Sequence, residues 1–168
     1  MSRERSLSLG GMLAAVNVIL LFISAAMPTS RLFLLVLSSF SVAIMVIEAN
    51  VNAGAAFYVA TSLLAFILMP NKLIAFYYAC FFGFYGIVKS YIERLSSNRF
   101  LEYVLKLIVF NLSLSIIYVV LKYVFAVNIF ISSYLSVLVF TLLQVSFVIY
   151  DYAYTVFVSF YLKKVKRH

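Results

Sequence analysis

Six long apolar runs follow one another along the chain, separated by short stretches that carry charge, Pro or Asn. Most of these runs approach the ~20 apolar residues that a helix needs to cross the ~30 Å hydrocarbon layer of a bilayer. The pattern predicts an all-α, multi-pass bundle in which both termini lie on the same side of the membrane. We expect six transmembrane helices, at residues 9–27, 32–49, 53–69, 73–92, 103–125 and 134–162.

The last apolar run is too long for one crossing. As a single helix, residues 129–162 would span about 50 Å at 1.5 Å per residue, well beyond the hydrocarbon core. We therefore assign residues 126–133 to an outer loop and let a long, tilted helix end at the basic tail.

Composition agrees with a membrane protein. Hydrophobic residues make up 66% of the chain and charged residues only 11%, whereas a soluble domain carries about 25% charged residues. Six crossings use about 120 positions, so we expect a single integral membrane domain over residues 1–168. With one cysteine and one histidine, the chain predicts neither an intrachain disulfide nor a metal site.

The basic residues predict the orientation. Lys and Arg concentrate in short cytoplasmic segments. With cytoplasmic termini, the inner side holds ten of them: Arg3, Arg5, Lys89, Arg94, Arg99, Lys106, Lys163, Lys164, Lys166 and Arg167. The outer side holds three: Arg31, Lys72 and Lys122. We therefore predict a cell-membrane protein, of bacterial type, with both ends in the cytoplasm and a retained first helix.

Nothing in the chain predicts catalysis. No Ser/His/Asp arrangement, paired carboxylates or HExxH motif is present. The segment GFYGIVKS has the length of a phosphate-binding loop, but Val88 stands where that loop requires Gly, and the segment lies inside an apolar helix. We expect no enzyme activity, no cofactor and no nucleic-acid partner.

Small residues recur at four-residue spacing on two helices, and such spacing permits close helix packing in lipid. On the fourth helix the residues are Ala75, Ala79 and Gly83, where the pattern favours packing inside the bundle. On the first helix they are Gly10, Gly11, Ala14 and Ala15. There the pattern fits either internal packing or docking of another subunit.

Asp151 is the one acid deep in a predicted span. Exposure of this carboxylate to lipid would cost ~3 kcal/mol, so we expect the side chain to face the bundle interior. Lys89 and Lys106 are the candidate cations, each about one turn from the inner end of its helix. A buried acid of this kind is either an ion or solute ligand or a member of a structural pair; the structural reading, a lysine pair or a Tyr hydroxyl, is favoured.

The outer loops carry charge of one sign only. Arg31, Lys72 and Lys122 lie there with Asn71 and Asn128, and no acid accompanies them. A pocket formed by these loops would favour a small anionic or polar solute. Lone basic residues at helix ends also act as interfacial anchors.

The predicted protein has six helices in under two hundred residues and cytoplasmic ends, and its first helix opens with LSLGGMLAAVNVILLF. In these features it resembles the substrate-binding S component of energy-coupling factor (ECF) transporters. The resemblance implies that Gly10, Gly11, Ala14 and Ala15 dock a transmembrane coupling subunit, which works with ATPase subunits. It also implies a substrate-binding role for Arg31, Asn71, Lys72 and Asn128. The short outer loops depart from the family's lid.

Two functions follow from these features. One is a transport subunit that binds a solute at the outer surface and uses an external ATPase module for release inside. The alternative is a non-catalytic membrane scaffold or assembly subunit of a bacterial envelope complex, with the charged hairpin of residues 89–106 as its cytoplasmic handle. A pore is disfavoured because the helices offer few polar faces.

Overall fold

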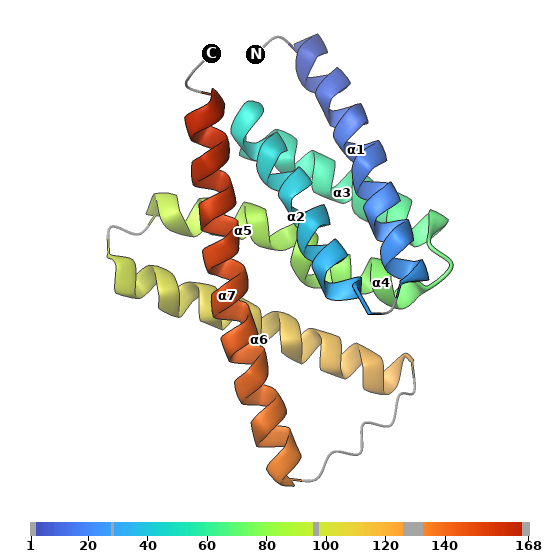
Figure 1. Ribbon diagram of the computed structural model, residues 1–168, viewed down its shortest axis with the longest axis vertical. Helices are drawn as coiled ribbons and strands as arrows, with labels where there is room; N and C mark the ends of the chain where they lie inside the picture. Colours follow the sequence, from blue (N-terminus) through green and yellow to red (C-terminus); the bar gives the residue numbers. More distant parts are fainter. Residues whose placement is uncertain (1–2, 28, 96–97, 126–132, 166–168) are drawn as a thin grey trace. The chain divides into compact units, whose positions relative to one another are not determined.

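A computed structural model describes residues 3–27, 29–95, 98–125 and 133–165, and these residues are almost entirely helical. The elements are α1 (Arg3–Ala26), α2 (Arg31–Glu48), α3 (Val51–Leu68), α4 (Lys72–Tyr77), the π-helix η1 (Tyr78–Phe82), α5 (Gly83–Leu95), α6 (Arg99–Tyr123) and α7 (Ser133–Val165) (Figure 1). Because α4, η1 and α5 run on as one span, the described residues contain six helices long and apolar enough to cross a membrane. The expected all-α fold, with six helices of transmembrane length and apolarity, is confirmed, and the side on which the termini lie stays a prediction.

Several helix ends differ from the expected ones. The first helix begins at Arg3 rather than at residue 9, and the fourth span continues to Leu95 rather than residue 92. Backbone hydrogen bonds favour continuing a helix past the apolar stretch, so hydropathy alone marks the helix end too early. The expected outer loop at 126–133 falls almost wholly outside the described residues; only Ser133, which begins α7, is described.

The chain divides into two compact units, residues 1–107 and residues 108–168, with the boundary inside α6. In the first unit, α1 packs against α2, α3 and α4, while α5 packs against α2 and α3. One apolar cluster includes Leu21, Leu35, Met69 and Ile74, and joins the ends of α1 and α3 to the starts of α2 and α4.

A second apolar cluster lies toward the other ends of the same helices. It includes Val42, Met45, Phe57 and Ile87, from α2, α3 and α5. With the partly buried residues packed against it, each of the two clusters contains residues from all of the first four spans, so the clusters join these spans at two levels.

Two glycines permit close approach in this first unit. A Cβ atom added at Gly83 would lie 2.8 Å from Cδ2 of Tyr58 and 2.9 Å from Cζ of Tyr78. A Cβ added at Gly54 would collide with a methyl group of Val46. The expected internal packing of the fourth span agrees with the position of Gly83.

In the second unit, α6 and α7 contact each other through aromatic rings and side-chain amides. The rings of Phe110 on α6 and Phe147 on α7 stack with centroids 4.4 Å apart and planes at 14°. Nearby, Asn111 accepts a hydrogen bond of 2.9 Å from the side-chain amide of Gln144. Amide pairs of this kind hold helices together in lipid, where apolar contact alone gives little preference.

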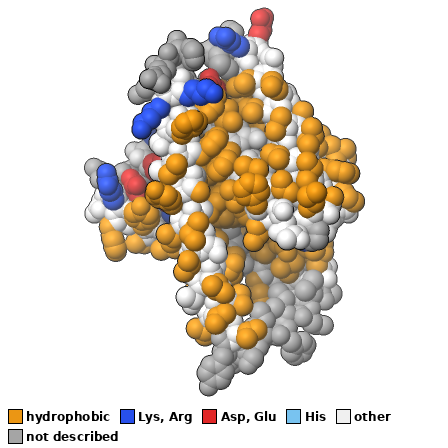
Figure 2. Space-filling view, in the orientation of Figure 1, with side chains coloured by type: hydrophobic (Ala, Val, Ile, Leu, Met, Phe, Trp, Pro, Cys, Tyr) orange, Lys and Arg blue, Asp and Glu red, His pale blue; other side chains and the backbone are white. Residues whose placement is uncertain are grey.

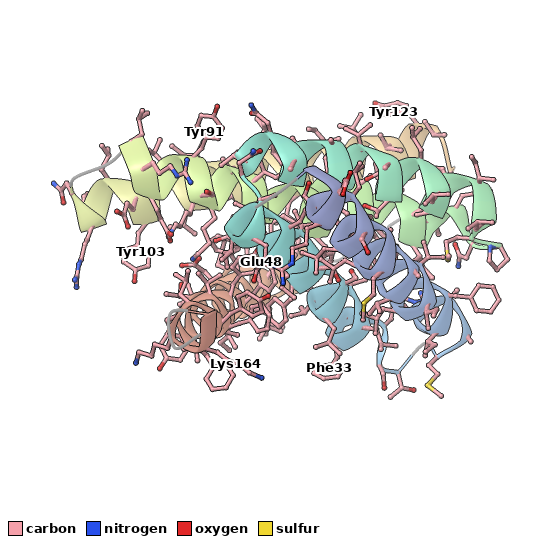
Figure 3. All side chains as sticks on the ribbon, turned by 90° about the horizontal axis from the view of Figure 1, so that it is seen from above. Phe33, Glu48, Tyr91, Tyr103, Tyr123 and Lys164 are labelled. Atoms are coloured by element: carbon pink, nitrogen blue, oxygen red, sulfur yellow. The ribbon has the colours of Figure 1, made fainter. Side chains whose placement is uncertain are left out.

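The surface is suited to lipid. Hydrophobic side chains cover most of the face seen in Figure 2, with few charged groups among them. Tyr91, Tyr103 and Tyr123 are exposed near helix ends (Figure 3), where amphipathic rings mark membrane interfaces. Together with the six spans, this surface supports a multi-pass membrane protein.

Candidate functional site

The small residues of α1 separate into two faces. Gly10 and Ala14 face the bundle: a Cβ added at Gly10 would lie 3.5 Å from Cε of Met45, and Ala14 packs against the second apolar cluster. Gly11 and Ala15 are exposed, and a Cβ added at Gly11 would meet nothing within 4 Å. Of the four residues expected to dock a partner, only Gly11 and Ala15 are exposed on the outer face of α1.

Asn71 and Lys72 take part in the turn between α3 and α4. The side-chain oxygen of Asn71 accepts from the backbone N–H of Leu73, which caps the start of α4. The Lys72 ammonium donates to the carbonyl oxygens of Phe66, at 2.6 Å, and Met69, at 2.9 Å. Lys72 therefore satisfies carbonyls at the end of α3, which have no partner within the helix.

Arg31 is the first residue of α2. Its backbone carbonyl accepts a hydrogen bond from the Ser24 hydroxyl, at 3.4 Å. Its Nε is buried and has no hydrogen-bond partner among the described residues. Asn128, the fourth residue predicted to bind solute, lies outside the described residues.

Lys89 and Lys106 come together at one carboxylate. Their ammonium groups lie 3.2 Å and 2.8 Å from the same oxygen of Glu93. Both lysines are buried, whereas the Glu93 side chain is 40% exposed. Lys89 also lies 5.9 Å from the ring centroid of Tyr85, within the range of a cation–π contact. Two buried cations near the ends of apolar helices are costly unless they are paired, so the shared contact with Glu93 is needed either for stability or for function.

Asp151 lies on α7 in the second unit and is 6% exposed. Its backbone carbonyl accepts a hydrogen bond of 2.8 Å from the hydroxyl of Thr155. Pairing of Asp151 with Lys89 or Lys106 stays a prediction. What the structure adds is the shared carboxylate of Glu93, whose spacing of four residues from Lys89 was the available sequence signal.

A buried polar chain crosses the core of the first unit, and sequence reasoning missed it. The Asn17 amide donates to the Tyr78 hydroxyl at 2.7 Å, and the Tyr78 and Thr61 hydroxyls lie 2.9 Å apart. Thr61 is also 2.8 Å from the carbonyl oxygen of Phe57. Since each hydroxyl has one proton, the consistent order of donation is Asn17 to Tyr78 to Thr61 to Phe57. The sequence did contain a signal for these hydrogen bonds, because Asn17 and Thr61 are polar residues inside apolar spans.

The π-helix η1 begins at Tyr78, the central residue of these buried hydrogen bonds. The Gly83 N–H donates to the Tyr78 carbonyl rather than to that of Ala79, its partner in a regular α-helix. The Ala79 carbonyl accepts instead from the Tyr58 hydroxyl, at 2.7 Å. A side chain of α3 thus satisfies a carbonyl that the wider turn leaves over, as backbone groups in lipid require.

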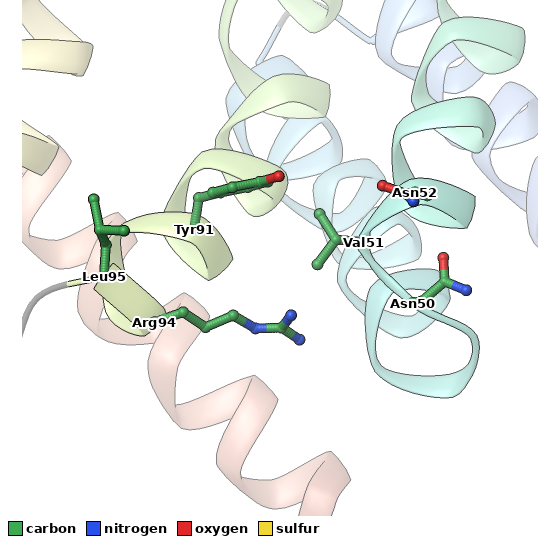
Figure 4. A pocket seen from close by; sticks show the side chains of 6 residues that line it. All are labelled: Asn50, Val51, Asn52, Tyr91, Arg94 and Leu95. Atoms are coloured by element: carbon green, nitrogen blue, oxygen red, sulfur yellow. The ribbon is translucent and has the colours of Figure 1, made fainter.

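Two cavities open on the first unit. One, of about 310 Å³, is lined by Asn50, Val51, Asn52, Tyr91, Arg94 and Leu95 (Figure 4). The other, of about 380 Å³, is lined by Arg5, Ser8, Leu9, Met12 and Glu48. Across the described part of the chain, no three His, Cys, Asp or Glu side chains come together in a way that could hold a metal ion.

Comparison of the chain with protein-family models, with curated proteins and with solved structures finds no match.

Proposed function

We propose that the protein is a solute-binding membrane subunit of an ECF-type importer, with an anionic or polar solute of unknown identity. The proposal rests chiefly on Gly11. Glycine inside a helix costs roughly 0.5–1 kcal/mol relative to alanine. At Gly54 and Gly83 a close neighbour within the fold accounts for that cost, whereas a Cβ at Gly11 would meet nothing within 4 Å.

A partner helix accounts for Gly11. Ala15 follows one turn later and is also exposed, so the pair forms a flat edge on an apolar helix. Small residues of this kind let a second helix approach closely in lipid. In the proposed importer, this edge docks the transmembrane coupling subunit, which carries the ATPase subunits.

The solute is held at the other end of α1, where α2 begins. Arg31 supplies the positive charge, and its buried Nε, without a partner among the described residues, supports a role in binding. Lys72 and Asn71 serve mainly to close the turn, as their hydrogen bonds to the backbone indicate. The proposal therefore assigns solute recognition to Arg31 ahead of the other outer residues.

Affinity purification of the tagged protein in mild detergent tests the proposal. We expect a coupling subunit and an ATPase pair to co-purify, and a small molecule to be released on denaturation. Ala15→Leu should remove the partner chains because the larger side chain fills the flat edge. Ala60→Leu is the matched control, because Ala60 is exposed on α3 and the substitution adds the same side-chain volume.

The outcomes separate docking from solute binding. Arg31→Gln should lose the small molecule and keep the partner chains. Equal loss of partners in the Ala15 and Ala60 variants would argue against docking through α1. Retention of the partner chains in the Ala15 variant would do so as well.

A scaffold role is the second candidate. It is favoured by the charged end of the first unit, where Arg94, Arg99 and Glu93 are all exposed. Such a surface suits contact with a protein at the membrane face. Recovery of envelope-assembly proteins, with no ATPase pair and no small molecule, would favour this role over transport.

A further inference from the structure

The cavity between α3 and α5 combines positive charge with apolar walls. Its lining comes from the α2–α3 connection and the start of α3 on one side, and from the end of α5 on the other. Figure 4 shows the Arg94 guanidinium and the Tyr91 hydroxyl reaching from α5 toward Val51 and the two asparagines. The cavity has a volume of about 310 Å³, is partly open to the surroundings, and is large enough for a small polar group.

The polar groups of this cavity are suited to an oxyanion. Arg94 brings a planar fork of N–H donors that matches phosphate geometry, and no acidic side chain lines the cavity. The neighbouring Glu93 contacts Lys89 and Lys106. Consecutive residues of a helix point in different directions, so this carboxylate leaves Arg94 available.

The donors around Arg94 are also available. In the described part of the chain, the side chains of Arg94, Tyr91 and Asn52 have no hydrogen-bond or ion-pair partner. The Asn50 side-chain oxygen accepts from the Ala53 N–H at 2.8 Å, which leaves its amide N–H₂ as a donor. Arg94 and Tyr91, which reach from α5 across the cavity, are thus the donors that an anion there would meet first (Figure 4).

In a bundle whose helices cross a bilayer, the cavity would lie at the level of the lipid headgroups. The spans Arg31–Glu48, Val51–Leu68 and Lys72–Leu95 follow one another, so the end of α2, the start of α3 and the end of α5 reach the same membrane surface. Val51 and Leu95 add apolar walls, and the Leu95 side chain is 86% exposed. A ligand with a phosphate head and an acyl tail satisfies both kinds of lining.

We propose that this cavity binds the phosphate group of an anionic phospholipid, with Arg94 as its principal ligand. The guanidinium forms a paired contact with two phosphate oxygens, while Tyr91 and Asn52 donate at the sides. The acyl chains leave past Leu95 into the bilayer. A soluble phosphate shares the headgroup's chemistry but lacks the tail that the apolar walls accommodate.

Native mass spectrometry of the full-length protein tests this site. The protein is released from mixed micelles that contain phosphatidylglycerol or phosphatidylcholine, and the retained lipids are counted. We expect one tightly held phosphatidylglycerol per chain, which Arg94→Gln weakens about tenfold, as loss of a charge-assisted hydrogen bond implies. Arg99→Gln is the matched control, because Arg99 is an exposed arginine outside the cavity lining.

Three further results decide the proposal. Arg94→Lys should retain part of the affinity, which separates loss of charge from loss of folding. Equal retention of phosphatidylcholine and phosphatidylglycerol, or equal weakening in the Arg94 and Arg99 variants, would overturn the site. Displacement of the lipid by millimolar inorganic phosphate would show that the cavity binds phosphate but that its ligand is a soluble phosphate rather than a phospholipid, and would overturn the proposal.

Discussion

The two units of the chain use different means to hold helices together. In the first unit, Asn17 and Thr61 are fully buried and joined through Tyr78, and Gly54 and Gly83 allow close packing. In the second unit, an amide pair and a ring stack beside it join α6 to α7.

The fourth span also differs from other helices in how much of it is buried. Half of its most apolar stretch is buried, against 17% of the corresponding stretches in α6 and α7 and also in α1 of its own unit. The fourth span is therefore central to its unit, whereas α6 and α7 leave most of their side chains to lipid or to a partner. Because apolar burial gives little drive in lipid, polar contacts and close packing decide where helices associate.

The largest expected effect is at Gly83. Gly83→Ala should destabilise the protein by about 1–3 kcal/mol, since the added methyl group meets the rings of Tyr58 and Tyr78. Gly11→Ala is the matched control and should be neutral or slightly stabilising, because its methyl group meets nothing within 4 Å. Reversible unfolding in mixed micelles measures both. Equal stability of the two variants would contradict close packing at Gly83.

The buried polar chain gives the next effect. Tyr78→Phe should cost about 1–2 kcal/mol, because it removes the hydroxyl between Asn17 and Thr61 and leaves a buried amide without its partner. Tyr152→Phe, at an exposed position of α7, makes the same chemical change and should cost little. The same unfolding measurement compares the two variants. A smaller loss of unfolding free energy in the Tyr78 variant than in the Tyr152 variant would show that the buried hydrogen bonds do not stabilise the core.

The smallest effect is expected in the second unit. A double-mutant cycle with Asn111→Ala and Gln144→Ala should give a coupling energy of about 0.6 kcal/mol, the average found for polar contacts between membrane helices. Unfolding of the two single variants and the double variant supplies the cycle. Strictly additive losses would mean that the two amides act independently.

Hydropathy was enough to predict the helices, but not how they associate. The six spans follow from apolar length, which backbone chemistry in lipid converts into helices. The wider turn of η1 and the contact between Tyr58 and Ala79 depend on the register of α3 against the fourth span. Register is a property of packing, and the local sequence does not encode it.

The candidate site was predicted in part for a similar reason. The charges of Lys72 and Lys89 were visible in the sequence, but the backbone carbonyls that bind Lys72 were not. The four-residue spacing of Lys89 and Glu93 was a signal for their ion pair, but the prediction paired Lys89 with Asp151 instead. The small residues of α1 were found as one group, and only the packing against Met45 separates Gly10 from Gly11. Arg94 drew attention as an inner charge, while its cavity depends on the approach of α3.

The account depends on six crossings with both ends in the cytoplasm, because this topology assigns Arg31 to the outer surface and Arg94 to the inner one. Cysteine labelling on intact cells tests it directly, in a Cys80→Ser background that carries Glu4→Cys, Thr29→Cys or Lys164→Cys. A membrane-impermeant maleimide should label position 29 at once, and positions 4 and 164 only after the cells are permeabilised. Labelling of position 4 or position 164 on intact cells would contradict the account.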